Sequence, residues 1–294
     1  IQRERSGHQT MPKTYNDLYL ATRTALKNAG VEAYALEARL LVAYAVGKTK
    51  EEFVRDLRLY TSDENEQKIA ALLQRRIAGE PLAYLIGEWE FHGLPIVVTP
   101  DVLIPRMDTE VLVDAALRVH DGRKMNARIL DLSSGSGCIG CALAHELPAA
   151  RVVMVDISEE ALAVSKENLR RNHQNRTICL KADALEKPPM GIGTFDLIVS
   201  NPPYVASMDI LTLDSSVRDY EPPGALDGGE DGLMFYRAIV RHWTQILRPG
   251  GWLMFEVGED QADAVMALMT EEKYTDVTAL EDTAGIRRVV VGRI

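Results

Sequence analysis

The chain has 294 residues, a formal net charge of −10 and a hydrophobic content of 46%. This length predicts about two domains, and the acidic balance disfavours a protein that grips nucleic-acid phosphates over a broad surface. No apolar stretch approaches the roughly 20 residues that a membrane-spanning helix needs. Three cysteines do not make a disulfide framework in a chain of this length, so we expect a reducing, cytoplasmic location and no membrane partner.

The N-terminal part of the chain has a helical pattern. Residues 1–10 are polar and lack the apolar core of a signal peptide, so we interpret them as a leader or a cloning remnant. Apolar residues then recur at helical spacing, in stripes that end at Gly30 and Gly47, and a third stripe begins after Ser62. Residues 11–79 are therefore predicted to form a small all-α domain.

A short β-rich segment follows this domain. The sequence Gly79-Glu80-Pro81 breaks the helical pattern. From Leu85 to Val98, apolar residues alternate with polar residues and glycines, which is typical of a β-hairpin that turns near His92-Gly93. We predict that residues 80–108 form a structured hairpin linker.

In residues 109–294, short β-branched runs alternate with stretches in which apolar residues have helical spacing. The predicted strands are residues 129–132, 152–155, 177–181, 195–200, 252–257, 274–280 and 288–292. Because only the last two are joined without a helix, the pattern predicts an α/β domain. It would have a seven-stranded, mostly parallel sheet with one reversed strand and helices on both faces. Gly135, Asp156, Asp183 and Asn201 all follow strands, so one crevice at the carboxyl ends can contain them.

The first strand of this domain leads into a small-residue loop, Ser133-Ser134-Gly135-Ser136-Gly137, and then into a helix of small and apolar residues. A strand, a tight turn and a helix N-terminus form the first unit of a nucleotide-binding sheet. The next strand ends at Asp156, which lies 156 − 135 = 21 residues past the first glycine, where a ribose-binding acid is expected. Together these features predict a cofactor that contains a nucleoside.

The fourth strand ends in the sequence Asn201-Pro202-Pro203-Tyr204. Each proline lacks an N–H and has φ fixed near −65°, and Asn201 is pushed to extended geometry because it precedes a proline. The result is a stiff rim of acceptors, made of a side-chain amide and backbone carbonyls. Such a rim suits a substrate with an –NH₂ group, whereas the alternative is an ordinary strand-to-loop turn.

Several of these motifs resemble known families. Asp131-Leu-Ser-Ser-Gly-Ser-Gly, Asp156 and Asn201-Pro-Pro-Tyr are similar to the motif set of class I S-adenosylmethionine-dependent methyltransferases that act on amino groups. The chain further resembles the release factor glutamine N5-methyltransferases at residues 76–91, 102–110, 220–226, 228–233 and 256–261. The likeness extends over nearly all of the chain from Met11 onward. Ser133 stands where that family usually has glycine, and Met107 where it usually has proline.

The resemblance implies S-adenosylmethionine as the cofactor and a peptide-chain release factor as the protein partner. Backbone N–H groups of residues 133–137 would meet the methionyl carboxylate at a helix N-terminus. Asp156 would accept both ribose hydroxyls, and Asp183 with the backbone of Ala184 would address the adenine. Asn201 would touch both the cofactor and the substrate.

The predicted chemistry addresses a weak nucleophile, because the lone pair of an amide nitrogen is delocalised into its carbonyl. The side-chain oxygen of Asn201 and the backbone carbonyl of Pro202 can each accept one N–H of the target glutamine. This arrangement aims the nitrogen at the sulfonium methyl. Pro203 completes the rim, and Tyr204 would pack over the flat amide. The sulfonium brings its own leaving group, so we expect no metal, and we expect the surplus proton to leave to water.

Other functions compete with this interpretation. A ribosomal-protein glutamine methyltransferase is the close alternative. A nucleic-acid adenine methyltransferase can use the same rim, but it needs a basic face that this acidic chain lacks, and we expect no direct nucleic-acid binding. A dinucleotide-binding oxidoreductase would leave the rim unexplained. Cys138 and Cys141 form a C-x-x-C pattern, which we interpret as small packed residues and not as a redox or zinc site. We expect a monomer.

Overall fold

The computed structural model describes residues 11–120 and 126–294, and the leader predicted for residues 1–10 lies outside them. The chain divides into two compact units at the bond between Ile86 and Gly87. None of the helices described is long and apolar enough to cross a membrane.

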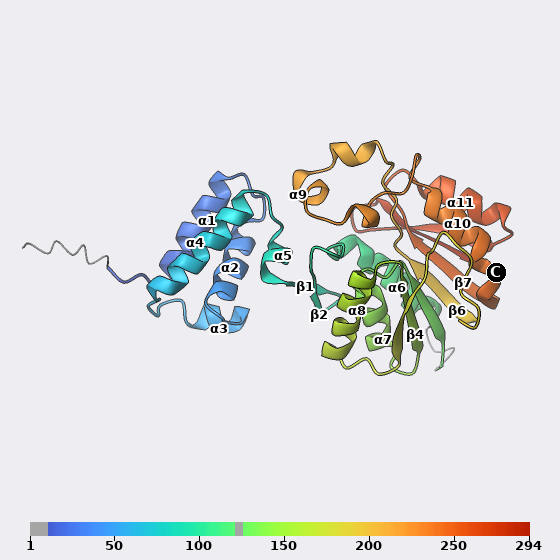
Figure 1. Cartoon of the computed structure of the whole chain (residues 1–294), viewed down its shortest axis with the longest axis horizontal. Coiled ribbons are helices and arrows are strands. Elements are labelled where there is room, and N and C mark those ends of the chain that lie inside the picture. Colours follow the sequence, from blue (N-terminus) through green and yellow to red (C-terminus); the bar gives the residue numbers. More distant parts are fainter. Residues whose placement is uncertain (1–10, 121–125) are drawn as a thin grey trace, which may run out of the picture. The chain divides into compact units, whose positions relative to one another are not determined.

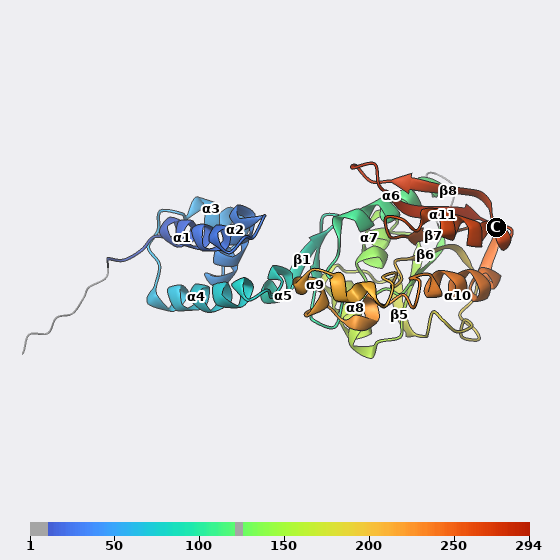
Figure 2. The same cartoon turned by 90° about the horizontal axis from the view of Figure 1, so that it is seen from above.

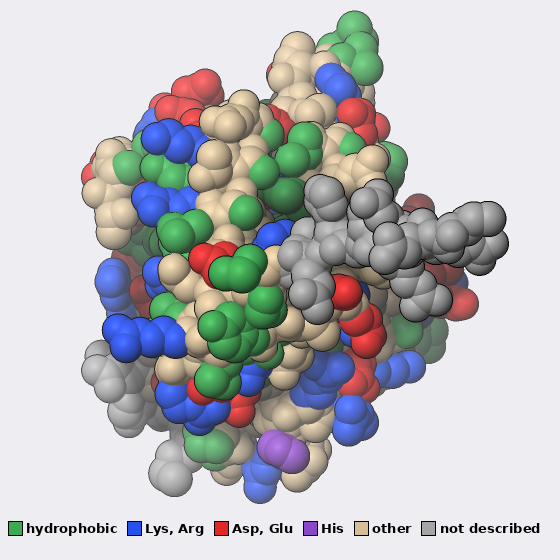
Figure 3. Space-filling model, turned by 90° about the vertical axis from the view of Figure 1, so that its left-hand side faces the viewer, with side chains coloured by type: hydrophobic (Ala, Val, Ile, Leu, Met, Phe, Trp, Pro, Cys, Tyr) green, Lys and Arg blue, Asp and Glu red, His purple; other side chains and the backbone are tan. Residues whose placement is uncertain are grey.

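The first unit is helical, as predicted (Figures 1 and 2). Its helices are α1 (Tyr15–Asn28), α2 (Tyr34–Ala45), α3 (Lys50–Arg55), α4 (Asp63–Ile77) and α5 (Leu82–Ile86). Thr14 and Thr49 begin α1 and α3 with capping boxes. Leu26, Leu41 and Phe53 are fully buried between the helices. Other apolar side chains of the unit remain exposed, and Figure 3 shows a face of the chain on which hydrophobic side chains lie among both signs of charge.

Two short helices of this unit, α3 and α5, were not predicted. Helix α5 occupies residues that the pattern assigned to the hairpin linker. The reason is that Pro81 starts a helical turn instead of ending one, because its carbonyl accepts the N–H groups of Tyr84 and Leu85 at 3.1 and 3.2 Å.

The second unit opens with the predicted hairpin, formed by β1 (Glu88–Phe91) and β2 (Leu94–Val97). The strands are antiparallel, and Phe91 lies opposite Leu94. His92 and Gly93 form the two-residue turn with φ values of 49° and 75°, which is the left-handed geometry that such tight hairpins require. The predicted turn position is therefore confirmed.

The sheet of the second unit confirms the predicted class. Its strands are β3 (Arg128–Leu132), β4 (Arg151–Asp156), β5 (Thr177–Lys181), β6 (Phe195–Ser200), β7 (Leu247–Glu256), β8 (Thr275–Glu281) and β9 (Arg287–Arg293). They lie in the order β5-β4-β3-β6-β7-β9-β8, and β9 runs antiparallel to both of its neighbours. The chain order reverses at β3, between β4 and β6. Ligands bind at such a switch point, at the carboxyl ends of the strands.

Helices cover both faces of this sheet (Figure 1). Helices α6 (Glu110–Val119), α7 (Cys138–Glu146) and α8 (Glu159–Arg171) lie on one face, and α10 (Met234–His242) and α11 (Ala262–Glu271) on the other. Leu130 and Leu132 of β3 point to the second face, where they share a buried core with Tyr236 and Val265. On the first face, α7 approaches β4 so closely that a Cβ on Gly140 would lie 2.4 Å from the Met154 side chain.

The structure differs from the expected elements around β7. The apolar spacing from Leu233 onward predicts a helix as far as Leu247, but α10 ends at His242 and is followed by a 3-10 turn. The sequence Pro249-Gly250-Gly251 predicts a turn before the strand that starts at residue 252. These residues instead lie inside β7, where the pairing with β6 shifts register. Gly250 adopts a φ of 78°, and its N–H donates to the carbonyl of Ile294 at 2.8 Å. These residues therefore form a β-bulge within β7.

Candidate active site

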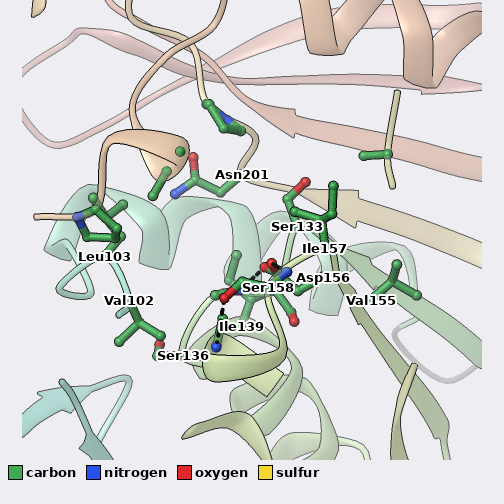
Figure 4. A pocket seen from close by; sticks show the side chains of 18 of the residues that line it. Val102, Leu103, Ser133, Ser136, Ile139, Val155, Asp156, Ile157, Ser158 and Asn201 are labelled. Atoms are coloured by element: carbon green, nitrogen blue, oxygen red, sulfur yellow. Dashed lines mark hydrogen bonds between the residues drawn. The ribbon is translucent and has the colours of Figure 1, made fainter. Parts of the chain in front are cut away.

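A cavity of about 350 Å³ lies at the carboxyl ends of β3, β4, β5 and β6. Figure 4 shows Asn201 and Asp156 projecting toward this hollow from different strand ends. The lining comprises residues 101–103, 105, 106, 109, 133–136, 138, 139, 155–158, 161, 182–185, 201, 203, 222, 224, 225 and 235. The cavity is mostly apolar with a few polar groups, as is usual for a small-molecule site.

The small-residue loop is shaped by left-handed backbone at Ser133, Gly135 and Gly137, with φ values of 65°, 54° and 79°. Glycine is required at 137, because a Cβ there would lie 2.9 Å from both Met154 Sδ and Ser165 Oγ. Gly135 has open space at the same position. The loop therefore leaves room for a ligand at Gly135 and packs tightly onto the protein at Gly137.

Helix α8 holds the loop from behind. The Ser165 hydroxyl donates to the Gly135 carbonyl at 2.9 Å, and Asn168 Nδ2 donates to the Ser136 carbonyl at 2.8 Å. Asn168 also exchanges hydrogen bonds with both backbone groups of Val97 in the hairpin, at 2.7 and 3.0 Å. The sequence interpretation missed both side chains, although polar residues on the buried stripe of an amphipathic helix are the signal that could have found them.

Asp156 ties the end of β4 to the loop. Its two carboxylate oxygens accept the backbone N–H groups of Gly135 at 2.8 Å and Ser158 at 3.0 Å. Burial raises the pKa of this carboxyl above its ordinary value, and the backbone hydrogen bonds oppose the rise. Each oxygen keeps a second lone pair, so the carboxylate can still accept hydroxyl groups of a ligand.

The chain after the third strand, β5, is fixed by Trp243, a residue that the sequence interpretation did not identify. Asp183 Oδ1 accepts the N–H of Leu185 at 2.9 Å, which forms a tight turn after β5. The fully buried Trp243 donates its indole N–H to the carbonyls of Ala184 and Glu186 at 3.1 and 3.0 Å. The turn at 183–185 therefore presents a fixed wall to the cavity.

The groups present fit S-adenosylmethionine. The Ser134 hydroxyl is buried on the cavity wall and has no hydrogen-bond partner among the residues described. An orphaned buried hydroxyl lowers the stability of the site unless a ligand pairs with it. Together with the Asp156 carboxylate and the open space at Gly135, it offers polar groups to a ligand that has an amino-acid end and a ribose.

The Asn-Pro-Pro-Tyr rim is anchored at both ends. The Ser200 hydroxyl donates to the carbonyl of Leu132 at 2.6 Å and fixes the end of β6 to β3. Gln261 Nε2 donates to the carbonyl of Tyr204 at 2.8 Å. Across residues 11–120 and 126–294, no protein group hydrogen-bonds the Asn201 side-chain amide. The rim therefore presents a free amide to the cavity on a rigid support.

Glycines of the following loop pack directly against the rim. A Cβ on Gly232 would lie 2.4 Å from the Tyr204 carbonyl oxygen, and one on Gly228 would lie 2.8 Å from Tyr204 Cα. Val205 pairs with the same loop through backbone hydrogen bonds to Leu226 and Gly228. This close approach explains why the segment needs glycine at these positions.

A buried carboxylate, Glu256, lies behind the rim at the end of β7. Thr109 donates its hydroxyl to one Glu256 oxygen at 2.5 Å, and the Tyr204 hydroxyl donates to the other at 3.3 Å. Burial raises the pKa of Glu256 to about 7, against the opposing effect of the two hydrogen bonds. Glu256 thus links the rim to the residue that precedes α6.

The predicted residues occupy different places around the cavity. Those that line it are Ser133, Ser134, Gly135, Ser136, Asp156, Asp183, Ala184, Asn201 and Pro203. Gly137 caps α7 behind the loop, and Pro202 and Tyr204 are not part of the lining. Arg106 and Thr109 are among the lining residues that were quoted for their likeness but given no role. Their partners lie more than 100 residues away in the sequence.

The two cysteines of the C-x-x-C pattern are free and buried. Burial raises the pKa of the Cys138 thiol to about 12. A thiol that stays protonated is a poor nucleophile and a poor metal ligand, which favours the packing interpretation of this pattern.

Comparisons with known proteins cover both units. Residues 17–87 match the family model described as "PrmC N-terminal domain", and residues 107–214 match "Methyltransferase small domain". A methyltransferase structure from Pyrococcus furiosus shares the fold, with a TM-score of 0.51 at 18% identity over 76% of this chain and 98% of that one. The release factor glutamine methyltransferase of Geobacter sulfurreducens is 44% identical, over 93% of this chain and 94% of its own. The enzyme of that name from Agrobacterium fabrum is 38% identical, over 93% and 95% of the two chains. The chain therefore belongs to the release factor glutamine methyltransferase family.

Proposed function

We propose that the chain transfers a methyl group from S-adenosylmethionine to the side-chain nitrogen (N5) of the glutamine in the Gly-Gly-Gln motif of peptide-chain release factors. The observation that carries this proposal is the free Asn201 amide, which projects into the same cavity as Asp156 (Figure 4). When bound, S-adenosylmethionine supplies an electrophilic sulfonium methyl and a neutral leaving group. The names of the relatives supply the identity of the protein substrate.

Three strand ends would hold the cofactor. The loop of residues 133–137, at the N-terminus of α7, would receive its carboxylate through backbone N–H groups. Those of Ser134, Gly135 and Gly137 donate within the protein, which leaves the N–H groups of Ser133 and Ser136 for this role. Asp156 would accept the ribose hydroxyls while it holds Gly135 in place. Asp183 and the backbone of Ala184, fixed by Trp243, would contact the adenine.

The rim would hold the reacting nitrogen. The side-chain oxygen of Asn201 and the carbonyl of Pro202 would each accept one N–H of the target amide, so that its lone pair points at the methyl group. Pro203 keeps this rim rigid, and Tyr204 would pack over the amide plane. Glu256 is engaged by Thr109 and Tyr204, so we assign the departing proton to water.

The two units would have different roles in the reaction. Residues 11–79 would recognise the release factor, residues 80–108 would act as the linker, and residues 109–294 would bind the cofactor and carry out methyl transfer. The enzyme would act as a monomer on a protein substrate, without direct contact to nucleic acid.

The test uses radiolabelled S-adenosylmethionine, intact release factor and peptide mass mapping. Asn201→Ala should lower kcat by about 100-fold or more with little change in KM, because the lost acceptor acts on the reacting nitrogen. Asn201→Asp keeps an acceptor oxygen and should retain partial activity, above that of the alanine variant. Asn175→Ala changes an exposed asparagine of a turn in the same unit and should have no effect.

The substrate provides the complementary test. Replacing the target glutamine by glutamate should abolish labelling, because a carboxylate offers no N–H pair to the rim. Full labelling of the glutamate substrate would show that the methyl group goes elsewhere and would overturn the proposed reaction.

A further inference from the structure

An ion pair between Arg106 and Glu221 connects two segments beside the cavity. The proposed reaction assigns a role to neither residue. Glu221 is almost fully buried, with its side chain 1% exposed. One of its oxygens accepts the N–H of Ile104 at 3.0 Å, and the other accepts a hydrogen bond from the Arg106 guanidinium. Glu221 thereby fastens the segment before α6 to the long loop that follows the rim.

The guanidinium of Arg106 keeps unused donors. Its side chain is 37% exposed and lines the cavity, and Glu221 is its one ionic partner within the described part of the chain. A guanidinium has five N–H donors in a fixed plane. Fixed by Glu221 on one side, it can bind an acceptor on the other.

Arg106 also lies near the rim. Burial raises the pKa of the Tyr204 phenol above its ordinary value, Glu256 adds to the rise, and the positive charges of Arg288 and Arg106 oppose it. Arg106 and Asn201 line the same cavity, and Tyr204 lies three residues beyond Asn201 in the sequence.

We propose that Arg106 is a substrate-binding residue that donates hydrogen bonds to main-chain carbonyl oxygens beside the target glutamine, and that Glu221 is the positioning residue that holds it. This inference rests on the proposed function. The two glycines before that glutamine have no side chains to shield their carbonyls, so a guanidinium can approach them closely. The cofactor carboxylate is the competing acceptor, because the N–H groups of Ser134, Gly135 and Gly137 in the loop already donate within the protein. The Kd for S-adenosylmethionine in the test below distinguishes the two acceptors.

The test needs variants that avoid a buried unpaired charge, because Arg106→Gln alone would leave Glu221 without its cation. The informative pair is Glu221→Gln and the double variant Arg106→Gln/Glu221→Gln. Relative to the single variant, the double variant should raise KM for intact release factor about tenfold or more. We expect kcat to change less, and we expect the calorimetric Kd for S-adenosylmethionine to stay within about twofold. Arg106→Lys keeps the ion pair but loses the planar fork, and it should give an intermediate KM.

Three outcomes would overturn the proposal. If KM is the same in the single and double variants, and Arg106→Lys matches the wild type, Arg106 serves structure alone. If the Kd for S-adenosylmethionine rises tenfold while KM for the release factor holds, Arg106 binds the cofactor carboxylate instead. If the wild-type enzyme does not label release factor, the proposed function is wrong, and so is this inference, which rests on it. The first two outcomes require a wild-type enzyme that does label.

Discussion

Ser133 adopts a left-handed backbone with a φ of 65°, a conformation that costs a residue with a Cβ about 1–2 kcal/mol. Ser133→Gly would remove this strain at an entropic cost of about 0.5–1 kcal/mol. We therefore expect Ser133→Gly to raise the free energy of unfolding by about 0.5–1 kcal/mol. Ser133→Val should lower it, because a β-branched residue fits this region least. Urea unfolding monitored by circular dichroism gives both values.

Ser136 supplies the control, because it belongs to the same loop and is not among the residues with positive φ. Ser136→Gly should lower the stability. If glycine has the same effect at both positions, strain at Ser133 is not what distinguishes them.

The second prediction at the residue scale concerns the buried carboxylate of Glu256. Its pKa is raised by burial from 4.5 to about 7. Between pH 4.5 and 7 the folded state therefore holds a proton that the unfolded state has lost, so stability falls as pH rises through this window. Asp131, with a pKa raised by burial to about 7, acts in the same direction. Glu256→Gln should remove one of the two contributions, on the order of 3 kcal/mol across the window.

The measurement is the free energy of unfolding at several pH values from 4.5 to 8, for wild type, Glu256→Gln and the exposed control Glu259→Gln. The Glu256 variant should gain stability relative to wild type as pH rises to about 7 and then keep a constant advantage. Parallel curves for all three proteins would mean that Glu256 is charged in the folded state throughout.

The sequence predicted the cavity residues better than their supports. Asp156 and Asn201 were found because they follow β-branched runs, and the carboxyl ends of parallel strands meet at one edge. Glu256 was quoted for its likeness but given no role, and Trp243 was not noted, because their partners lie 52 or more residues away and only the folded chain brings them together. A buried glutamate at a strand end looks in sequence like any surface charge.

At the scale of elements, Asn168 joins the hairpin, helix α8 and the small-residue loop. Its side chain bonds both backbone groups of Val97 and the carbonyl of Ser136. Asn168→Ala would leave these buried groups unpaired, and we expect it to lower stability by about 2–4 kcal/mol. Hydrogen exchange at the Val97 amide should become faster in the variant, which mass spectrometry of hairpin peptides can measure.

The control is Asn172→Ala, four residues later at the C-cap of α8. Asn172 also donates to the hairpin, to the carbonyl of Pro95 at 3.2 Å, but it lies nearer the surface. Its removal should lower stability by less than about 1 kcal/mol. Equal effects of the two substitutions would show that the link through Asn168 is no stronger than a surface contact.

Element boundaries show where local pattern stops being informative. The sequence predicts a strand over residues 177–181 and a helix over residues 159–171, and β5 and α8 have these bounds because β-branched runs and capping residues mark their ends. The bulge in β7 was read as a turn, because Pro249-Gly250-Gly251 has turn chemistry whatever its neighbours are. Pairing with β6 and hydrogen bonds to Arg293 and Ile294 keep this segment in the sheet.

At the scale of the whole molecule, the two units differ in what they leave exposed. Among the residues that the structure describes, the first unit, although much the smaller, carries about as many large exposed apolar side chains as the second. They are Met11, Leu20, Leu36, Tyr44, Val54, Leu59, Tyr60 and Ile77. Exposed apolar area on a small helical unit favours an interaction with another protein surface, which agrees with the proposed role in recognising the release factor.

The last prediction separates this role from cofactor binding. A truncated chain of residues 87–294 keeps the whole cavity lining, which begins at Asp101. It should therefore bind S-adenosylmethionine with a Kd within about threefold of the full chain, since no contact worth more than about 0.7 kcal/mol is removed. Methylation of intact release factor should fall by about 100-fold in kcat/KM, because the docking contacts of the helical unit are lost. A short Gly-Gly-Gln peptide lacks the rest of the release factor that the helical unit would recognise, so it should be methylated at the same slow rate by both proteins. If the truncated chain methylates the intact release factor as efficiently as the full chain does, the helical unit is not the part that recognises the release factor.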